Sequence, residues 1–355
     1  MAECPIPKKM YPEQSEQIRL TGHYRRKNKF LVLFLISCAV LIAGFAVSAL
    51  WGNGGADWLE NRQDGIPNEQ DTDDTEGTIR DSESDSGAEE DLEPSVIPTD
   101  ATPIVSRDLS LADRGIKYIN NESIYAPDLE ALLEYDISSA ISDGPMVLIL
   151  HTHTSEAYME MEEAYIQGNL GTVTYSDDEK RNVIGVGEVL CDTLNQNGLS
   201  AIHCRAIHDG DGMRGAYDRA EESIRFFLTH YPSIKYVIDL HRDAILTEGG
   251  EYVRAVTEID GEAVAQVMSV VGSDGGGEAC DGWEENLALA LQLRSMLNSN
   301  GKSICRPVTL RNATYNQEFA PYSLLLEIGT GANSVEEAKR AAELVGKSLA
   351  NLIGK

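Results

Sequence analysis

Two histidines and a glutamate stand close together directly after a run of apolar residues. Residues 147–150 read V-L-I-L and follow Asp143-Gly144-Pro145, which is typical of a buried strand entered from a turn. His151, His153 and Glu156 therefore lie at the carboxyl end of this strand, where open α/β sheets bind their ligands. In the H-x-x-E spacing of His153 and Glu156, an imidazole and a carboxylate share one face of a turn. Both groups are ligands that Zn²⁺ prefers.

The same stretch also fits a polar turn at a strand end, with Glu156 placed where a helix begins and the dipole favours an acid. A second buried run, residues 234–240, argues for the metal site because it too ends in a histidine, His241, followed by Arg242 and Asp243. Parallel strands present their carboxyl ends at one edge of a sheet. We therefore expect His241 on the same edge as the first two histidines.

Glu327 lies inside the apolar run of residues 323–329, where an ionised carboxylate is costly unless it is paired. One interpretation is a salt bridge, with Arg242 or Arg311 as the partner. The other is a general base or acid beside a metal-bound water, because burial raises the pKa of a carboxyl group towards neutrality.

Strands and helices are expected to alternate, which predicts an α/β fold with a mostly parallel sheet and helices on both faces. Helices are predicted at 129–133, 182–197, 217–228, 284–298 and after Ser334, whose side chain can form a capping box with Glu337. Further strands are predicted at 200–207, 234–240, 252–258, 264–272, 304–310 and 323–329. Residues 159–181 are polar and read as a surface excursion beside the site.

The 355 residues carry a formal net charge of −29, which argues against a nucleic-acid partner because phosphate binding requires Lys and Arg. The six cysteines form no C-x-x-C pair, so neither a cysteine zinc site nor a dithiol redox motif is expected.

The chain divides into four predicted parts. Residues 1–29 form a short cytoplasmic tail that ends in basic residues, and residues 30–51 form an uncharged apolar run long enough to span a bilayer. The positive-inside rule places everything that follows outside the cytoplasm; a cleaved signal peptide is the alternative. Residues 52–104 are acidic and polar, which predicts a disordered linker, and residues 105–355 are predicted to form the extracytoplasmic domain.

Several motifs, in this order, resemble the stage II sporulation protein P family: H-T-H-T-S-E-A-Y at 151–158, N-V-I-G-V-G at 182–187, D-L-H-R-D-A at 239–244, Y-N-Q at 315–317 and L-L-L-E-I-G-T-G-A-N at 324–333. The resemblance covers residues 105–355. It implies a zinc-dependent peptidoglycan hydrolase with N-acetylmuramoyl-L-alanine amidase activity that also cuts peptide cross-links. It further implies work in engulfment during sporulation, beside the glycan-cleaving stage II sporulation protein D.

The order of histidines and acids is also similar to that of zinc amidases and carboxypeptidases. This likeness implies His153, Glu156 and His241 as zinc ligands and Glu327 as the base that activates water and then protonates the leaving amine. Arg242 is the candidate donor to the oxyanion.

Alternatives to these assignments stay open. His151 can exchange roles with His153 or support it, and Glu179 can replace Glu156, because amidases usually take this ligand from the start of the following helix. Asp243 is expected to orient a ligand histidine or to pair with Arg242. Tyr315, Asn316 and Gln317 line the substrate cleft or form a polar turn.

Two other functions compete with the hydrolase. One is a membrane-tethered module that binds murein without cleaving it, and the other is a metallocarboxypeptidase that acts on proteins. The predicted location is the cell membrane, with the C-terminal domain between the septal membranes during sporulation.

Overall fold

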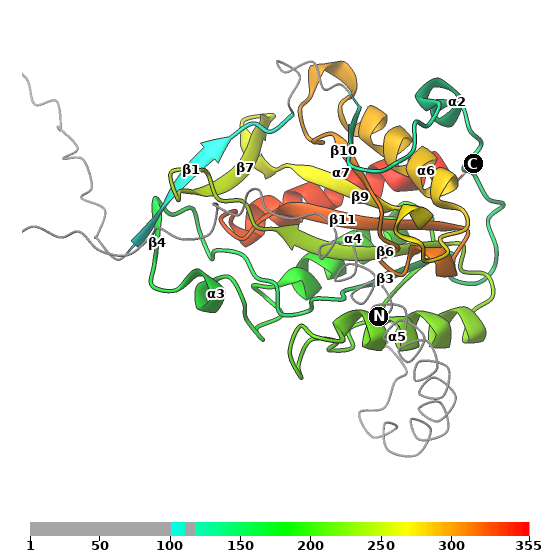
Figure 1. The fold of residues 1–355 in the computed structure, drawn as a ribbon, viewed down its shortest axis with the longest axis horizontal. Helices are drawn as coiled ribbons and strands as arrows, with labels where there is room; N and C mark the ends of the chain where they lie inside the picture. The colour runs from blue at the N-terminus through cyan, green and yellow to red at the C-terminus, as the bar shows by residue number, and fades with distance from the viewer. Residues whose placement is uncertain (1–100, 111–117, 355) are drawn as a thin grey trace, which may run out of the picture. The chain divides into compact units, whose positions relative to one another are not determined.

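The structure is a computed structural model that describes residues 101–110 and 118–354 (Figure 1). The predicted tail at 1–29 and anchor at 30–51 lie outside the described residues, as does the linker up to residue 100. Residues 101–104, the predicted end of the linker, already belong to strand β1 (Ala101–Arg107). All described residues form one compact unit. None of the helices among them is long and apolar enough to cross a membrane.

A seven-stranded sheet forms the centre of the fold, with its strands in the order β2-β10-β9-β11-β6-β3-β5. All neighbouring pairs are parallel except β9 and β11, which are antiparallel. The prediction of an α/β fold is confirmed, but the sheet is mixed, because β9, β10 and β2 run opposite to the other four strands. The bounds are β2 Ile119–Asn121, β3 Val147–Leu150, β5 Ala201–His203, β6 Tyr236–Asp243, β9 Val267–Gly272, β10 Val308–Arg311 and β11 Tyr322–Thr330.

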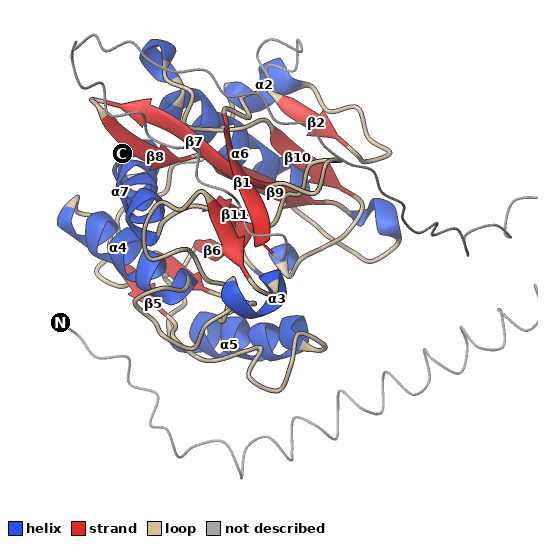
Figure 2. Cartoon of the chain, turned by 90° about the vertical axis from the view of Figure 1, so that its left-hand side faces the viewer, coloured by secondary structure: helices blue, strands red, loops and turns tan. Residues whose placement is uncertain are grey.

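Helices cover both faces of this sheet (Figure 1 and Figure 2). Helix α4 (Val183–Gln196) joins β3 to β5, and α5 (Ala216–His230) leads back from β5 to β6. The α4 connection moves outward along the sheet from β3 to β5, and the α5 connection moves back in the other direction from β5 past β3 to β6. Because both connections are right-handed, the two helices lie on opposite faces of the sheet. Helix α7 (Val335–Ile353) packs against α4 on one side and against α6 (Trp283–Leu297) on the other. Side chains alternate along β3, so Val147 and Ile149 face this group and enter the main core.

A smaller second sheet, β4-β1-β7-β8, stands beside the main one (Figure 1). Its strands are β4 (Tyr165–Gln167), β7 (Tyr252–Ile259) and β8 (Glu262–Ala265) together with β1. The single strand predicted at 264–272 is divided, because the chain leaves β8 at the buried Gln266 and enters the main sheet as β9.

Several element boundaries differ from the prediction. The strand expected at 200–207 ends at His203, and the one expected at 304–310 begins at Val308, because Pro307 has no N–H to pair. The excursion at 159–181 contains β4 and a short helix, α3 (Leu170–Val173). Helix α2 (Leu129–Leu133) and the Ser334–Glu337 capping box of α7 are as predicted. Three 3-10 turns complete the fold: η2 Asp274–Gly276, η3 Ser299–Gly301 and η4 Gln317–Phe319.

Candidate metal centre and active site

Three of the predicted side chains meet at the carboxyl ends of β3 and β6. The Nδ1 of His241 lies 3.2 Å from one oxygen of Glu156, and the Nδ1 of His153 lies 3.5 Å from the other. One candidate ligand atom from each of these residues lies within 4.8 Å of the other two. The imidazole rings of His153 and His241 are edge to face, with 5.1 Å between the ring centroids. Two imidazoles and one carboxylate are therefore positioned to hold a single ion.

The residue that aligns His241 was missed in the sequence. Asp239 lies two residues before it on β6, so both side chains point to the same face of the sheet. Its carboxylate lies 3.0 Å from His241 Nε2 and accepts hydrogen bonds from the backbone N–H and the hydroxyl of Thr152. A carboxylate on the second nitrogen of a ligand histidine fixes the ring and its tautomer. The D-x-H spacing on a strand was the available signal.

A second missed carboxylate, Asp209, holds the loop on the other side of His153. It accepts hydrogen bonds from the hydroxyl of Thr154 and from the backbone N–H and hydroxyl of Ser155. The backbone on both sides of His153 is therefore held by hydrogen bonds, to Asp239 before it and to Asp209 after it. No sequence signal pointed to Asp209, because it comes from a loop far along the chain.

The electrostatics of the centre favour a positive charge. Burial opposes protonation of His241, but Asp239 and Glu156 outweigh it and hold the pKa of His241 well above its usual value. Burial likewise opposes ionisation of Glu156, but His241, His153 and Arg242 keep its pKa well below the ordinary range. A bound divalent cation would supply the same charge and free His241 Nδ1 as a ligand, so the residues present fit a metal ion.

Glu327 is the register partner of His241 on the adjacent strand β11, so both side chains stand on the same face. Burial raises the pKa of Glu327 to about 8. Its buried Oε2 has no hydrogen-bond partner among the described residues. Neither predicted salt-bridge partner reaches it, because Arg311 pairs with Glu122 and Arg242 is engaged elsewhere. A largely buried carboxyl group with one unpartnered oxygen, beside a candidate metal centre, has the properties of a general base.

The guanidinium of Arg242 does not lie where an oxyanion donor is needed. It donates to the carbonyl oxygens of Ala157 and Thr174 and stacks 4.7 Å above the ring of Tyr175. It therefore fixes the 159–181 excursion to β6. Only the backbone N–H of Arg242 reaches the centre, where it donates to Glu156 at 3.2 Å.

The alternative ligands are also separated from the centre. His151 is fully buried, where its Nδ1 contacts the carbonyl oxygen of Leu240 and its Nε2 lies 2.8 Å from the Nε2 of His203. Glu179 is partly exposed and forms an ion pair with Arg205. Asp243 pairs with Arg306 at 2.9 Å and not with Arg242. These positions favour His153 and Glu156 as ligands.

The three residues predicted to line the substrate cleft, Tyr315, Asn316 and Gln317, make different contacts. Gln317 is buried and exchanges hydrogen bonds with the backbone of Gly272 and Val270, so it anchors the loop before β11. Asn316 donates to the carbonyl oxygen of Tyr217 at 2.9 Å. Tyr315 stands next to Tyr217, with 6.2 Å between the ring centroids. The ring of Tyr217 in turn packs against His153 at 5.6 Å, so Tyr217 is a further site residue missed in the sequence.

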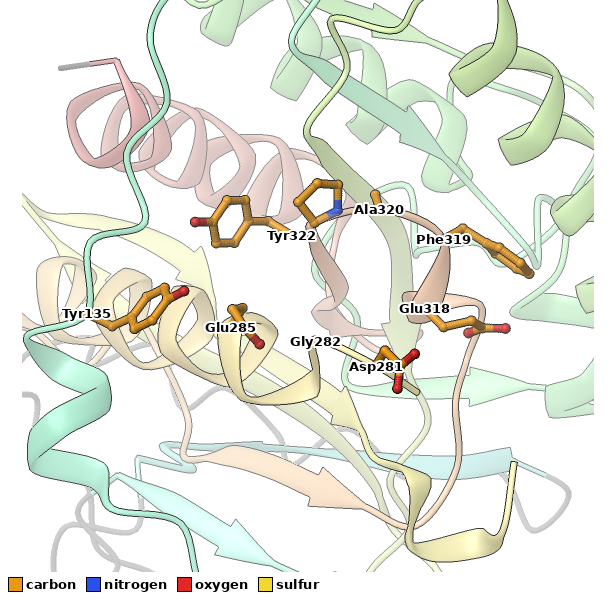
Figure 3. Close-up of a pocket in the computed structure, with 9 residues that line it drawn as sticks. Tyr135, Asp281, Gly282, Glu285, Glu318, Phe319, Ala320 and Tyr322 are labelled. Carbon is orange, nitrogen blue, oxygen red and sulfur yellow. The ribbon is translucent and has the colours of Figure 1, made fainter. Parts of the chain in front are cut away.

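A hollow on the surface lies away from these residues. It has a volume of about 510 Å³ and opens beside the amino end of β11, whereas Glu327 lies further along that strand (Figure 3). Three aromatic rings and three carboxylates line it, from Tyr135, Phe319, Tyr322, Asp281, Glu285 and Glu318. None of the predicted site residues borders it. The candidate metal centre therefore lies outside this hollow, at the carboxyl ends of β3 and β6.

The fold and the site define an α/β protein with a candidate metal centre at the carboxyl ends of two parallel strands. The model of the stage II sporulation protein P family matches residues 58–350, so the chain belongs to that family. A curated relative, stage II sporulation protein P of Bacillus subtilis (strain 168), is 26% identical over 211 residues. This match covers 56% of the chain and 49% of the relative, about half the relative's length.

Solved structures give weaker likenesses. The N-acetylmuramoyl-L-alanine amidase AmiC2 of Nostoc punctiforme is 14% identical, with a TM-score of 0.35, over 60% of this chain and 100% of that one. The CwlD amidase from Clostridioides difficile, solved in complex with the GerS lipoprotein, is 12% identical, with a TM-score of 0.31, over 58% of this chain and 98% of that one. At such scores the likeness does not decide between functions.

Proposed function

We propose that the chain is a zinc-dependent peptidoglycan hydrolase. Its main reaction is the cleavage of the amide between the muramic lactyl group and L-alanine, and cleavage of peptide cross-links is a second activity. The observation that carries this proposal is the convergence of His153, Glu156 and His241 beside the unpaired Glu327 in a member of this family. When bound there, zinc supplies a Lewis acid and lowers the pKa of a water molecule.

Glu327 carries the proton transfers. Burial raises the pKa of Glu327 towards neutrality, so its carboxyl group is suited to both accept and release a proton. Its carboxylate form takes the proton from the attacking water, and the resulting acid then delivers this proton to the amine nitrogen as the C–N bond breaks. Asp239 and Asp209 keep the two histidines in place during these steps.

The proposed location follows from the N-terminal sequence. Residues 30–51 anchor the chain in the cell membrane, residues 1–29 stay in the cytoplasm, and the acidic segment up to residue 100 spaces the hydrolase from the bilayer. The domain then acts on septal peptidoglycan during engulfment. A stage II sporulation protein D-like lytic transglycosylase and other engulfment membrane proteins are the proposed partners.

The test is digestion of purified murein by the full chain in detergent, with zinc or with chelator, followed by mass analysis of the products. We expect freed stem peptides and new muramic acid ends, and we expect both to disappear with chelator. Murein that is bound but left intact would instead favour the non-catalytic module. Trimmed ordinary peptides beside intact murein would favour a protein carboxypeptidase.

A further inference from the structure

The proposed reaction gains from a hydrogen-bond donor to the carbonyl oxygen of the amide, and the residue predicted for this role does not provide it. When water adds to an amide carbonyl, the π electrons move onto the carbonyl oxygen, and a fixed hydrogen-bond donor there usually accelerates the reaction strongly. Arg242 was the candidate, but its guanidinium donates to the carbonyl oxygens of Ala157 and Thr174. A donor that acts beside the Lewis acid must therefore come from another residue near His153, the most exposed of the candidate ligands.

Tyr217 is such a residue. Among the three candidate ligands, His153 has the most exposed side chain, at 23%, and the ring of Tyr217 packs edge to face against it. Burial raises the pKa of Tyr217, and the negative charges of Asp239, Glu327 and Glu156 raise it further. A phenol has an ordinary pKa of about 10, so it carries its proton at neutral pH.

The hydroxyl of Tyr217 is also available. No hydrogen bond of this group is found within residues 101–110 and 118–354, although the side chain is half-buried. The neighbouring Tyr315 differs, because its hydroxyl interacts with Arg311. Arg306 is the remaining cation near Glu327, but it is 5% exposed and held by Asp243, so a substrate cannot reach it.

The position of Tyr217 is fixed by an unusual piece of backbone. Tyr315 and Asn316 both have positive φ angles, 53° and 59°, which non-glycine residues rarely adopt. Such strain persists only where surrounding contacts impose it, and it is concentrated at functional sites. Here Gln317 ties the loop to β9, and Asn316 donates to the backbone of Tyr217 in the first turn of α5. The strained loop therefore holds α5 against the centre.

We propose that the hydroxyl of Tyr217 donates a hydrogen bond to the carbonyl oxygen of the scissile amide as negative charge develops on it. The inference rests on the proposed function and adds a catalytic residue to it. Tyr217 keeps its own proton throughout: water supplies the new C–O bond, Glu327 carries the proton to the amine, and the C–N bond breaks. The donor contributes in the transition state more than in the bound substrate.

The experiment compares Tyr217→Phe with Tyr231→Phe, which removes the same hydroxyl from the far end of α5, where the ring stacks on Phe227. We expect Tyr217→Phe to lower kcat about 100-fold on a muramyl peptide, with KM and bound zinc nearly unchanged. Tyr231→Phe should stay within a few-fold of wild type. Circular dichroism and melting temperature show whether each variant is folded.

A binding measurement gives a second readout that does not depend on turnover. A phosphinate analogue of the lactyl-alanine amide resembles the tetrahedral state, and its affinity should fall in Tyr217→Phe by a factor close to the loss in kcat. The uncleaved muramyl peptide should bind equally to Glu327→Gln and to the double variant Glu327→Gln/Tyr217→Phe.

Unchanged kcat and analogue affinity in Tyr217→Phe would overturn the inference and leave the hydrolase intact. A second outcome would also overturn the inference. If Tyr217→Phe lost zinc or failed to fold, and Glu327→Gln/Tyr217→Phe no longer bound the uncleaved peptide, Tyr217 would have a structural role. A wild-type chain that neither cleaves nor binds murein fragments would overturn the proposed function itself.

Discussion

Glu327 illustrates what a single residue contributes at this site. Folding removes its carboxyl group from water without giving its Oε2 a hydrogen bond, and a buried polar atom without a partner costs about 1–3 kcal/mol. The pKa of Glu327 rises to about 8 in consequence. The ionised carboxylate is thus less stable at this position than it would be on the surface, but its basicity suits proton transfer at neutral pH.

The first prediction follows from this unfavourable burial. In metal-free protein, Glu327→Gln should unfold at a higher temperature than wild type, and the difference should grow between pH 5 and pH 8. The folded pKa is raised, so the stability this group contributes is complete below about pH 4.5 and is lost as pH rises through 8. At pH 8 the expected gain is about 1–3 kcal/mol.

The same variant should retain zinc but not turn over. Thermal melting over this pH range, zinc content and murein digestion are the measurements. Equal stability of the two proteins at pH 8 would show that Glu327 is better solvated than its position indicates, and residual turnover near the wild-type rate would show that another group is the base.

The second prediction separates the two histidines of the H-T-H motif. His153→Ala should weaken zinc binding by at least about 100-fold, because it removes a ligand. The matched change His151→Asn should leave zinc affinity within about tenfold, since His151 contacts Leu240 and His203 and not the centre. Titration calorimetry with zinc compares the two variants. The reverse order of affinities would exchange the roles of His151 and His153.

Sequence reasoning at the residue scale reached the candidate ligands and the candidate base because strand ends and apolar runs are local patterns. It did not reach Asp209 or Tyr217, since Asp209 contacts Thr154 and Ser155, and Tyr217 contacts His153, only through the tertiary fold. Arg242 was misassigned for a related reason. Its charge was visible in the sequence, but the carbonyl oxygens that bind its guanidinium belong to a distant excursion.

At the scale of elements, the loop between β10 and β11 depends on one glycine. A Cβ on Gly272 would stand 2.1 Å from the carbonyl oxygen of Ala313 and 2.9 Å from that of Thr314. The N–H of Gly272 is also bonded to Gln317. The end of β9 and the loop that carries Tyr315 therefore lie in direct backbone contact, which a side chain would separate.

The third prediction is that Gly272→Ala displaces this loop. The conflict is with backbone atoms, so we expect a loss of about 1–3 kcal/mol in the free energy of unfolding, together with reduced murein cleavage. Gly249→Ala is the control, because its nearest atom would be a side-chain oxygen at 3.6 Å, an ordinary contact. Urea unfolding measures both. A Gly272→Ala protein as stable and active as the control would contradict the argument.

Sequence patterns predicted the helices and the buried strands well, since these elements carry their periodicity within a short window. They did not predict β1 and β4, which are mostly only partly buried and are defined by the pairing of β1 with β4 and with β7. The antiparallel pairing of β9 with β11 could not be predicted either, because the composition of a strand does not depend on its direction in the sheet.

For the whole molecule, three histidines outside the ligand group, two buried and one partly buried, govern the expected response to acid. Burial lowers the pKa of His151 to about 4 and also lowers the pKa values of His203 and His208. These rings stay neutral when folded but take up protons when unfolded, below about pH 6.5. His241 and Glu327 act in the opposite direction because their pKa values are raised.

The fourth prediction is that metal-free protein loses stability between pH 6.5 and pH 5, by about 1–3 kcal/mol. The unfolded chain binds more protons than the folded chain over this range, so the free energy of unfolding falls as pH falls. His203→Gln should flatten this dependence, and the control Glu221→Gln, on the exposed side of α5, should not. Chemical denaturation at several pH values tests it, and a stability that rises towards pH 5 would refute it.

The positions of β1 and β2 have a consequence for the biogenesis of the protein. Ile104 pairs with Tyr252, and Ile119 pairs with Val308, so the first of the described strands to leave the ribosome have partners that emerge much later. Until then their edges are unsatisfied and open to mispairing. Chaperone protection during synthesis would therefore matter most for these two strands.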